Sequence, residues 1–357
     1  MKPAVAAPPP TEIAAALSRR VVGQSGAVRE MAIALAKKLA GLGTGNILMV
    51  GSSGTGKTTL MRAVEHYLAS EAALARRSAI VRIHANVLGE EAEAGRPGGM
   101  VLRRLLERAR EQLGPHAAPD EYLDRARQGL VFVDEVDKIR SLVGGGPNVR
   151  GIRAQEALLT LIENEAVPLD LPLWLGGGAV TVDSSGLLFV CAGAFEGLYD
   201  AVYDRITIGI DRGSLKPVTV VVDAKVREEL QFRLRDWLRN EDLFDYGMTP
   251  QFLSRFDSVV LLEDLGEEEL VRIFLEAPDS GFQQTRDFIE SRGLKLAVSA
   301  SAVRAVARAA RLQPRLGARA LKEVFRRVVR DLEFEPEKRA REGVVFLDAG
   351  DVERALA

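Results

Sequence analysis

Residues 46–59 read NILMVGSSGTGKTT, and this stretch decides the fold. Its first part, Ile47 to Val50, is a short apolar run beside glycines, which predicts a buried strand. The residues after it match the spacing G-x-x-x-x-G-K-[ST] of a phosphate loop, with the lysine at Lys57 and the hydroxyl at Thr58. Apolar residues then recur at helical intervals, so the motif has the strand, loop and helix that it requires.

The residue types of this loop suit the phosphates of a nucleotide. Glycine lets backbone N–H groups curve around a phosphate without a Cβ clash, and the N-terminal end of the next helix attracts the same anion. Lys57 can reach the outer phosphates, and the Thr58 hydroxyl can bind Mg²⁺. The alternative is a glycine-rich turn with a surface lysine. We expect nucleotide contacts from Gly54, Thr55, Gly56, Lys57, Thr58 and Thr59.

A second apolar run ends in two acids. Leu130 to Val133 predict another buried strand, and Asp134 and Glu135 follow it. Ligands of open α/β sheets bind at the carboxyl ends of the strands. We therefore expect Asp134 to support Mg²⁺ together with Thr58, and Glu135 to orient or deprotonate the attacking water.

Composition limits the class of protein. The chain has 357 residues, of which 47% are hydrophobic and 27% charged, as in ordinary globular proteins. A net charge of −2 gives no general attraction to nucleic acid or to an anionic membrane. No apolar run approaches the ~20 residues of a membrane span, and the start lacks the pattern of a secretory signal. Cys191 is the only cysteine, so an internal disulfide is excluded, and a cytoplasmic location is expected.

Strands alternate with helical patterns up to about residue 263, which predicts an α/β fold with a parallel sheet covered by helices on both faces. From Gly266 onward the pattern is mostly helical. We expect a flexible lead at 1–18 with a helical stretch around Glu12–Leu17, a large α/β domain at 19–264 and a smaller helical domain at 265–357.

Three less regular stretches carry separate expectations. The glycines and acids of 85–99 predict a loop. Residues 167–178 read as a loop that exposes Leu173, Trp174 and Leu175, and 224–242 as a charged helix.

With a phosphate loop, an acidic strand and a helical C-terminal part, the chain resembles the AAA+ ATPases, and among them the ClpX-type protein unfoldases. The resemblance covers most of residues 19–340 and depends on six segments in the right order. They are similar to the adenine-side segment (22–24), the extended acidic motif (129–139), the helix before the second pore loop (155–163), the segment GAFxGL (193–198), the box that ends in an arginine finger (249–256) and the second sensor (316–321).

This resemblance implies ATP hydrolysis in a ring, usually a hexamer, with nucleotide between neighbouring subunits. It implies that Val21 and Val22 lie beside the adenine. Arg255 would reach the γ-phosphate of the neighbour, and Arg319 would touch the phosphates of its own subunit. A guanidinium suits both tasks because it is always charged and fork-shaped. Read alone, either arginine would more often be a surface salt-bridge partner. No residue is assigned as first sensor, where Cys191 offers only a weak donor.

Two departures concern the protein substrate. Such unfoldases carry a zinc-binding N-terminal domain, and this sequence has no cysteine cluster for one, so recruitment by that route is not expected. Their pore loop reads Gly-aromatic-Val-Gly, whereas Gly95-Arg96-Pro97-Gly98 stands here. Arginine and proline supply charge and stiffness in place of a large apolar contact. The loop would suit an acidic or phosphate-bearing partner, or it has lost its grip on polypeptide. Trp174 and Leu175 could grip instead, unless Trp174 packs against its own domain.

A third departure concerns a partner peptidase. The family docks through an aliphatic-Gly-Phe tripeptide, and Ile208-Gly209-Ile210 lies near the matching place without the phenyl ring. Docking to a ClpP-like peptidase therefore stays open, with a short strand or turn as the alternative. The segment 216–240 has no clear counterpart in the family.

Two functions remain in view. The first is a ring-forming ATPase that unfolds or remodels a protein partner. The second is a nucleic-acid-associated ATPase or switch, because basic residues recur at helical spacing and could contact phosphates. Acidic residues interrupt that stripe, so a solvated or subunit-facing surface is its plainer explanation. A nucleotide kinase fits poorly because it would not need arginines in separate domains. The basic residues are Arg319, Lys322, Arg326 and Arg330.

Overall fold

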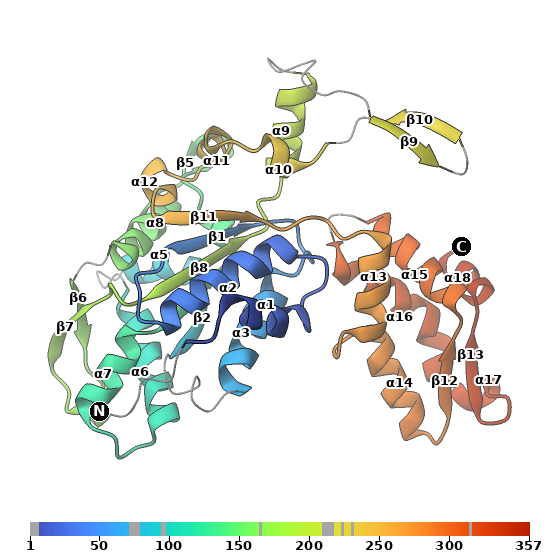
Figure 1. The fold of residues 1–357 in the computed structure, drawn as a ribbon, viewed down its shortest axis with the longest axis horizontal. Coiled ribbons are helices and arrows are strands. Elements are labelled where there is room, and N and C mark those ends of the chain that lie inside the picture. Colours follow the sequence, from blue (N-terminus) through green and yellow to red (C-terminus); the bar gives the residue numbers. More distant parts are fainter. Residues whose placement is uncertain are drawn as a thin grey trace. The chain divides into compact units, whose positions relative to one another are not determined.

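Five strands form the parallel sheet that the apolar runs of the sequence predict (Figure 1). Their order is β11-β1-β8-β3-β2, and every neighbouring pair is parallel. Helices cover a parallel sheet on both faces, so its strands can be apolar at every position, and β8 is buried along its whole length. The strands are Asn46–Val50 (β1), Ile80–His84 (β2), Leu130–Asp134 (β3), Leu188–Gly193 (β8) and Phe256–Leu261 (β11).

This computed structural model describes residues 7–70, 79–93, 98–163, 166–208, 218–222, 225–229, 232–313 and 316–357. The chain divides into two compact units. The first consists of residues up to Pro8, Ile33–Val50 and Leu68–Leu261, and the second of Pro9–Ala32, Gly51–Tyr67 and Leu262–Ala357. The sheet belongs to the first unit, whereas the phosphate loop belongs to the second, together with the C-terminal helices.

Amphipathic helices accompany the sheet in the first unit. Helix α6, for example, buries Val101, Leu102, Leu105 and Leu106 on one face, as its spacing predicts. The helices are Asn86–Glu93 (α5), Gly99–Leu113 (α6), Pro119–Arg127 (α7), Val149–Ile162 (α8), Leu198–Thr207 (α9), Leu234–Trp237 (α10), Asn240–Tyr246 (α11) and Pro250–Leu253 (α12), with 3₁₀ turns at Val136–Ile139 (η1) and Leu173–Leu175 (η2).

Three antiparallel hairpins complete the described strands of this unit. They pair Leu142–Val143 (β4) with Gly146–Pro147 (β5), Ala166–Asp170 (β6) with Ala179–Asp183 (β7), and Val218–Val222 (β9) with Lys225–Glu229 (β10). Helices Ser25–Leu39 (α2) and Lys57–Ser70 (α3) each contribute residues to both units.

The second unit has a helical core of its own. Phe274 and Phe325 meet edge to face with ring centroids 4.7 Å apart, and α16 buries one apolar stripe. A short parallel pair, β12 with β13, joins these helices. The elements are Pro10–Ser18 (α1), Glu267–Glu276 (α13), Gly281–Ser291 (α14), Lys295–Val298 (β12), Ala300–Arg311 (α15), Ala318–Phe334 (α16), Pro336–Arg339 (α17), Val344–Leu347 (β13) and Ala349–Leu356 (α18).

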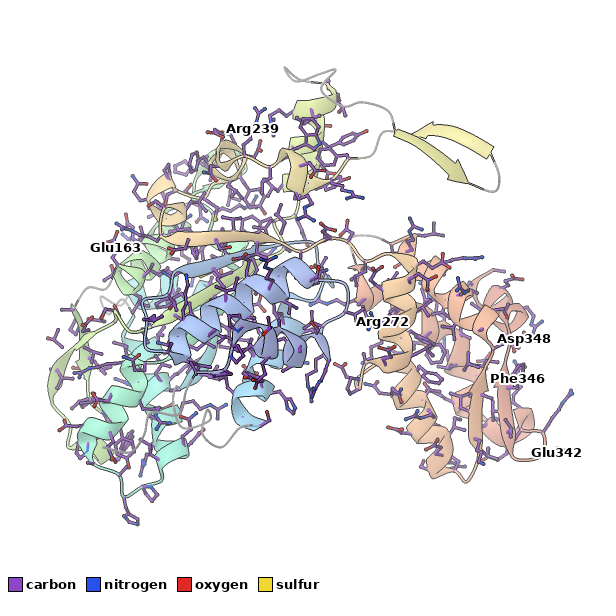
Figure 2. The ribbon with its side chains drawn as sticks, in the orientation of Figure 1. Glu163, Arg239, Arg272, Glu342, Phe346 and Asp348 are labelled. Atoms are coloured by element: carbon purple, nitrogen blue, oxygen red, sulfur yellow. The ribbon has the colours of Figure 1, made fainter. Side chains whose placement is uncertain are left out.

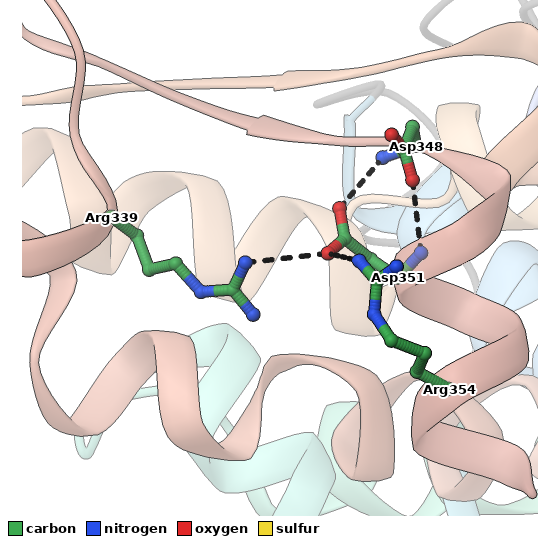
Figure 3. Close-up of polar contacts among 4 residues, drawn as sticks. All are labelled: Arg339, Asp348, Asp351 and Arg354. Carbon is green, nitrogen blue, oxygen red and sulfur yellow. Dashed lines mark hydrogen bonds and ion pairs between the residues drawn. The ribbon is translucent and has the colours of Figure 1, made fainter.

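Charged side chains secure the last helix of this unit (Figure 3). Asp348 caps α18 by accepting the Asp351 N–H at 2.9 Å. The Asp351 carboxylate accepts the Asp348 N–H at 3.1 Å, Arg339 at 3.3 Å and Arg354 at 2.7 Å. The capping box and the two guanidinium groups therefore fix the start of α18 against α17.

Two of the irregular stretches differ from prediction. The loop predicted at 85–99 is wrong for Asn86–Glu93, which form α5. The charged helix predicted at 224–242 is also wrong, because Lys225–Glu229 form β10 and two short helices follow. Lysine, arginine and glutamate favour helices by local propensity, but the adjacent β9 offers a strand to pair with, and this tertiary context prevails.

The predicted exposed loop at 167–178 is largely structured. Trp174 contacts Tyr122 edge to face, with ring centroids 5.3 Å apart, and the Arg110 guanidinium lies 4.4 Å from its ring centre. Leu175 is buried, whereas Leu173 is 93% exposed. Trp174 thus packs against its own unit, the second of the two alternatives considered above.

The predicted flexible lead also contains structure. Its part from Pro10 to Ser18 is helix α1, in which Ile13 and Leu17 are fully buried, so this part is anchored to the protein. The boundaries predicted at 18 and 264 stay predictions.

Candidate functional site

The phosphate loop follows β1 directly and has the backbone that its glycines permit. Gly54 and Gly56 have φ of 76° and 107°, a region that residues with a Cβ avoid. Thr55 is buried, and its hydroxyl donates to the Ser52 carbonyl at 2.9 Å, which closes the turn. The first N–H groups of α3 have no intrahelical acceptor, so they are available to an anion.

Lys57 is held inside this loop. Its Nζ donates to the carbonyls of Gly51 and Ser52, the latter at 2.8 Å, and only 8% of the residue is exposed. A positive charge fixed within a glycine loop favours a phosphate there. Thr58 is half-buried and Thr59 exposed in the first turn of α3.

An acidic residue that sequence reasoning missed lies near this lysine. Partial burial raises the pKa of the Asp264 carboxyl, whereas a hydrogen bond with Ser52 and the charge of Lys57 act to lower it. The charge of Asp264 is therefore coupled to Lys57 and to the phosphate loop.

Gln24 ties the predicted adenine-side segment to the loop. Its Nε2 donates to the Thr55 carbonyl at 3.0 Å and to the Glu263 carbonyl at 2.8 Å, and its Oε1 accepts the Glu263 N–H at 3.1 Å. Because Gln24 is 4% exposed, these bonds satisfy an amide that water cannot reach. Val21 is buried and Val22 half-buried in the same segment.

The predicted second sensor contacts the phosphate loop. Arg319 Nη1 donates to Ser53 Oγ at 2.8 Å. The backbones also meet, since the Ala318 N–H donates to the Gly54 carbonyl at 3.1 Å. A Cβ on Gly54 would lie 2.1 Å from the Leu316 carbonyl oxygen, so only glycine permits this approach. The structure thus brings Arg319 to the loop, and its guanidinium is exposed there.

Asp134 and Glu135 end β3 as predicted. Asp134 is half-buried, and its Oδ1 accepts the Glu135 N–H at 2.9 Å. Glu135 has φ 59°, a conformation that is uncommon for a residue with a side chain and that clusters at functional sites. His84 ends the adjacent strand, and its Nδ1 lies 3.7 Å from Glu135 Oε2. His84 is a polar neighbour that the sequence did not single out.

Arg255 lies beside the same sheet, but at the amino ends of its strands. It precedes Phe256, which pairs with Asn46 at the amino end of β1, whereas Glu135 follows the carboxyl end of β3. The Arg255 side chain is 47% exposed, and its Nη2 lies 2.5 Å from Glu163 Oε1. Asn46 Nδ2 donates to the Arg255 carbonyl at 3.2 Å. Glu163 and Asn46 were not predicted as partners of this arginine.

Three other sequence hypotheses concern the first sensor, the pore loop and the tripeptide at 208–210. Cys191 is fully buried in β8, where burial raises the pKa of its thiol, and the first sensor stays unassigned. The pore-loop residues Gly95, Arg96 and Pro97 lie outside the described residues, as do Gly209 and Ile210 of the tripeptide. Ile208 is described and is 72% exposed.

Two general features of the described residues bear on function. No described helix combines the length and the apolar character that a bilayer crossing requires. No group of three or more His, Cys, Asp and Glu among the described side chains could hold a metal. A Mg²⁺ ion normally takes one or two protein oxygens and completes its shell with phosphate and water, so it does not need such a group.

Comparison with known proteins agrees with this geometry. Residues 43–259 match the family model of the AAA domain (Cdc48 subfamily). The chain is 31% identical over 344 residues to the ATP-dependent Clp protease ATP-binding subunit ClpX 3 of Methylococcus capsulatus, a match that covers 94% of this chain and 72% of that protein. The ClpX of Bacteroides thetaiotaomicron is 29% identical over 363 residues, covering 96% and 80%. The ClpX 2 of Wolinella succinogenes is 29% identical over 349 residues, covering 92% and 78%.

The family model spans more than half of the chain. It contains the phosphate loop and the acidic strand, and it covers the sheet as far as β11. The relatives extend the similarity into the C-terminal helices. The chain therefore belongs to the AAA family of ATPases, as a divergent member similar to ClpX.

Proposed function

We propose that this ATPase works as a ring, most simply a hexamer, that unfolds or remodels a protein partner. The phosphate loop binds ATP, Glu135 activates the attacking water, and Thr58 and Asp134 hold Mg²⁺, which when bound neutralises phosphate charge. The name of the relatives, ATP-binding subunit of a Clp protease, supports a protein substrate. A cytoplasmic location and docking to a peptidase remain predictions.

One observation in particular supports assembly into a ring. Arg255 lies beside the amino end of β1, and the phosphate loop leaves β1 at the opposite end, after Val50. Four strand residues at ~3.3 Å each separate these ends by roughly 13 Å, which exceeds the reach of one arginine side chain. This separation supports a role for Arg255 at the nucleotide of a neighbouring subunit.

Mixing of variants tests this proposal. We expect Arg255→Ala to lower ATP turnover by about 100-fold or more, because an arginine acting in trans stabilises transition-state charge. Adding Lys57→Ala subunits should restore activity, since they supply the arginine while the Arg255→Ala subunits supply the loop. Arg272→Ala is the control, because Arg272 forms an exposed 3.5 Å ion pair with Glu276 on its own helix. Full-speed hydrolysis by a monomeric Arg255→Ala protein would overturn the proposal.

The alternative of a nucleic-acid switch receives less support. It depends on the basic stripe that begins at Arg319, and this arginine donates to Ser53 in the phosphate loop. The contact favours a nucleotide-facing role for the first member of the stripe. Steeply salt-dependent binding of DNA or RNA that stimulates hydrolysis would restore the alternative.

A further inference from the structure

Glu163 forms an ion pair with Arg255, the arginine that the proposed function places at the nucleotide of a neighbouring subunit. Arg255 Nη2 lies 2.5 Å from Glu163 Oε1, and the Glu163 side chain is 29% exposed. Glu163 follows the last residue of α8 and is labelled in Figure 2. An ion pair between side chains this exposed typically adds little to the stability of a protein. Stability of the fold is therefore a weak reason for the contact.

The place of Glu163 on its helix strengthens this point. Glu163 is the C-cap of α8, and its N–H donates to the Leu159 carbonyl at 2.8 Å. The C-terminal end of a helix carries partial negative charge, so a carboxylate there is unfavourable. Glu163 thus stands where the helix itself disfavours an acid, and the Arg255 guanidinium compensates.

The backbone of Arg255 is fixed by separate contacts. The Asn46 amide donates to the Arg255 carbonyl at 3.2 Å and accepts the Phe189 N–H at 3.0 Å, which links the arginine to β1 and β8. The Arg255 N–H donates to the Phe252 carbonyl at 3.2 Å. With the backbone anchored, the contact with Glu163 defines where the guanidinium lies.

We propose that Glu163 is a positioning residue for Arg255, which orients the guanidinium before the nucleotide of a neighbouring subunit reaches it. A guanidinium has five N–H donors, so a contact with one carboxylate oxygen leaves donors for a phosphate. Charge that is already oriented stabilises a transition state without reorganisation at the moment of reaction. This inference rests on the proposed trans role of Arg255.

Three substitutions give the first test. Glu163→Gln keeps the side-chain shape but removes the charge, and we expect it to lower kcat about 10-fold with little change in KM for ATP. Glu163→Asp keeps the charge and should recover part of the loss. Glu276→Gln, which breaks an exposed ion pair on α13, should leave turnover at the wild-type level. Wild-type kcat in Glu163→Gln would overturn the inference.

Mixed assemblies separate positioning from general damage. In the first mixture, Glu163→Gln is combined with Lys57→Ala, so that it stands in the subunit that donates Arg255 to Arg255→Ala partners. In the second, it is combined with Arg255→Ala, so that it stands in the subunit that supplies the loop to Lys57→Ala partners. We expect slower turnover only in the first mixture.

Each other outcome has a definite meaning. Equal losses in both mixtures would indicate structural damage and overturn the positioning role alone. Absence of recovery in the plain mixture of Arg255→Ala with Lys57→Ala would overturn the trans geometry, and this inference with it.

Discussion

At the scale of single residues, the carboxylate of Glu135 shows how backbone conformation aims a side chain. With a φ of 59°, Glu135 leaves the extended backbone conformation of β3, and half of its side chain is exposed. We expect Glu135→Gln to slow ATP hydrolysis ~100-fold or more, because general-base catalysis contributes at least that much, while ATP binding persists. Phosphate release and nucleotide titration measure the two effects.

A matched acid controls for this substitution. Glu90 lies on α5 and forms an exposed 3.0 Å ion pair with Arg150, so Glu90→Gln should hydrolyse ATP at the wild-type rate. If Glu135→Gln also did so, Glu135 would not be the base.

Lys38 makes stability depend on pH. Burial lowers the pKa of Lys38 to about 8, and its Nζ donates to the Gly186 carbonyl and, at 3.4 Å, to Gln128. Above that pH the folded protein releases this proton, while the unfolded chain keeps it until the usual lysine pKa of about 10.4. The free energy of unfolding should therefore rise across this range, by at most about 3 kcal/mol.

The neighbouring lysine supplies the comparison. Lys37 is exposed on the same helix, so Lys37→Met should keep the rise in unfolding free energy, whereas Lys38→Met should remove it. Denaturant titrations at pH 7.5, 9 and 10.5 are a suitable series, at roughly the limits that the two pKa values set. An unchanged slope in Lys38→Met would show that another group titrates.

These residues also show what the sequence could not predict. The loop glycines, Lys57 and the paired acids carry local spacing signals, and the structure places them on the expected strand ends and helix. Gln24 and Asn46 act through partners 239 and 209 residues away. Such pairs leave no local pattern, because the contact exists only once the sheet and the helices have assembled.

At the scale of elements, helix α8 and its C-cap contact both ends of the arginine-finger box. Gln155 bonds to Thr249, and Glu163 pairs with Arg255. The Gln155 amide donates to the carbonyls of Ile139 and Gly247 at 2.7 and 3.0 Å. It also accepts the N–H and the hydroxyl of Thr249, both at 2.9 Å. Gln155 is 1% exposed, so a single buried side chain connects η1, which follows the acidic strand, to the box.

Gln155→Leu should be strongly destabilising. It keeps a similar volume but leaves two carbonyls and two donors without this partner, and each such buried group costs ~1–3 kcal/mol. We expect a loss of about 4 kcal/mol or more in unfolding free energy, measured by denaturant titration. Glu156→Gln, at the exposed next position on α8, should change it by less than ~0.5 kcal/mol. A small effect of Gln155→Leu would mean that water replaces the lost bonds.

Elements with strong periodicity were predictable and those without it were not. The amphipathic α13, α14, α15 and α16 lie in the part from Gly266 onward that the sequence predicts as mostly helical, because one buried stripe defines each. Helix α5 contains Gly89 and several acids, which obscured its pattern. Strand β10 has the composition of a helix and depends on pairing with β9.

At the scale of the whole molecule, ATP turnover should depend on assembly. If Arg255 completes the site of a neighbour, turnover per subunit rises with protein concentration and then levels off. Steady-state hydrolysis over a dilution series, followed in parallel by light scattering, measures both quantities. Arg255→Ala should assemble with the wild-type midpoint yet stay slow at every concentration. Constant turnover per subunit from monomer to assembly would contradict a shared site.

The bond from the Ala318 amide to the Gly54 carbonyl has a practical consequence. That proton sits where α16 begins, yet its acceptor belongs to the segment that surrounds phosphate. Deuterium uptake at this one amide should slow when ATP or ADP saturates the protein. A spectroscopist could thus follow nucleotide occupancy from a reporter more than 250 positions further along the chain, without any dye or label.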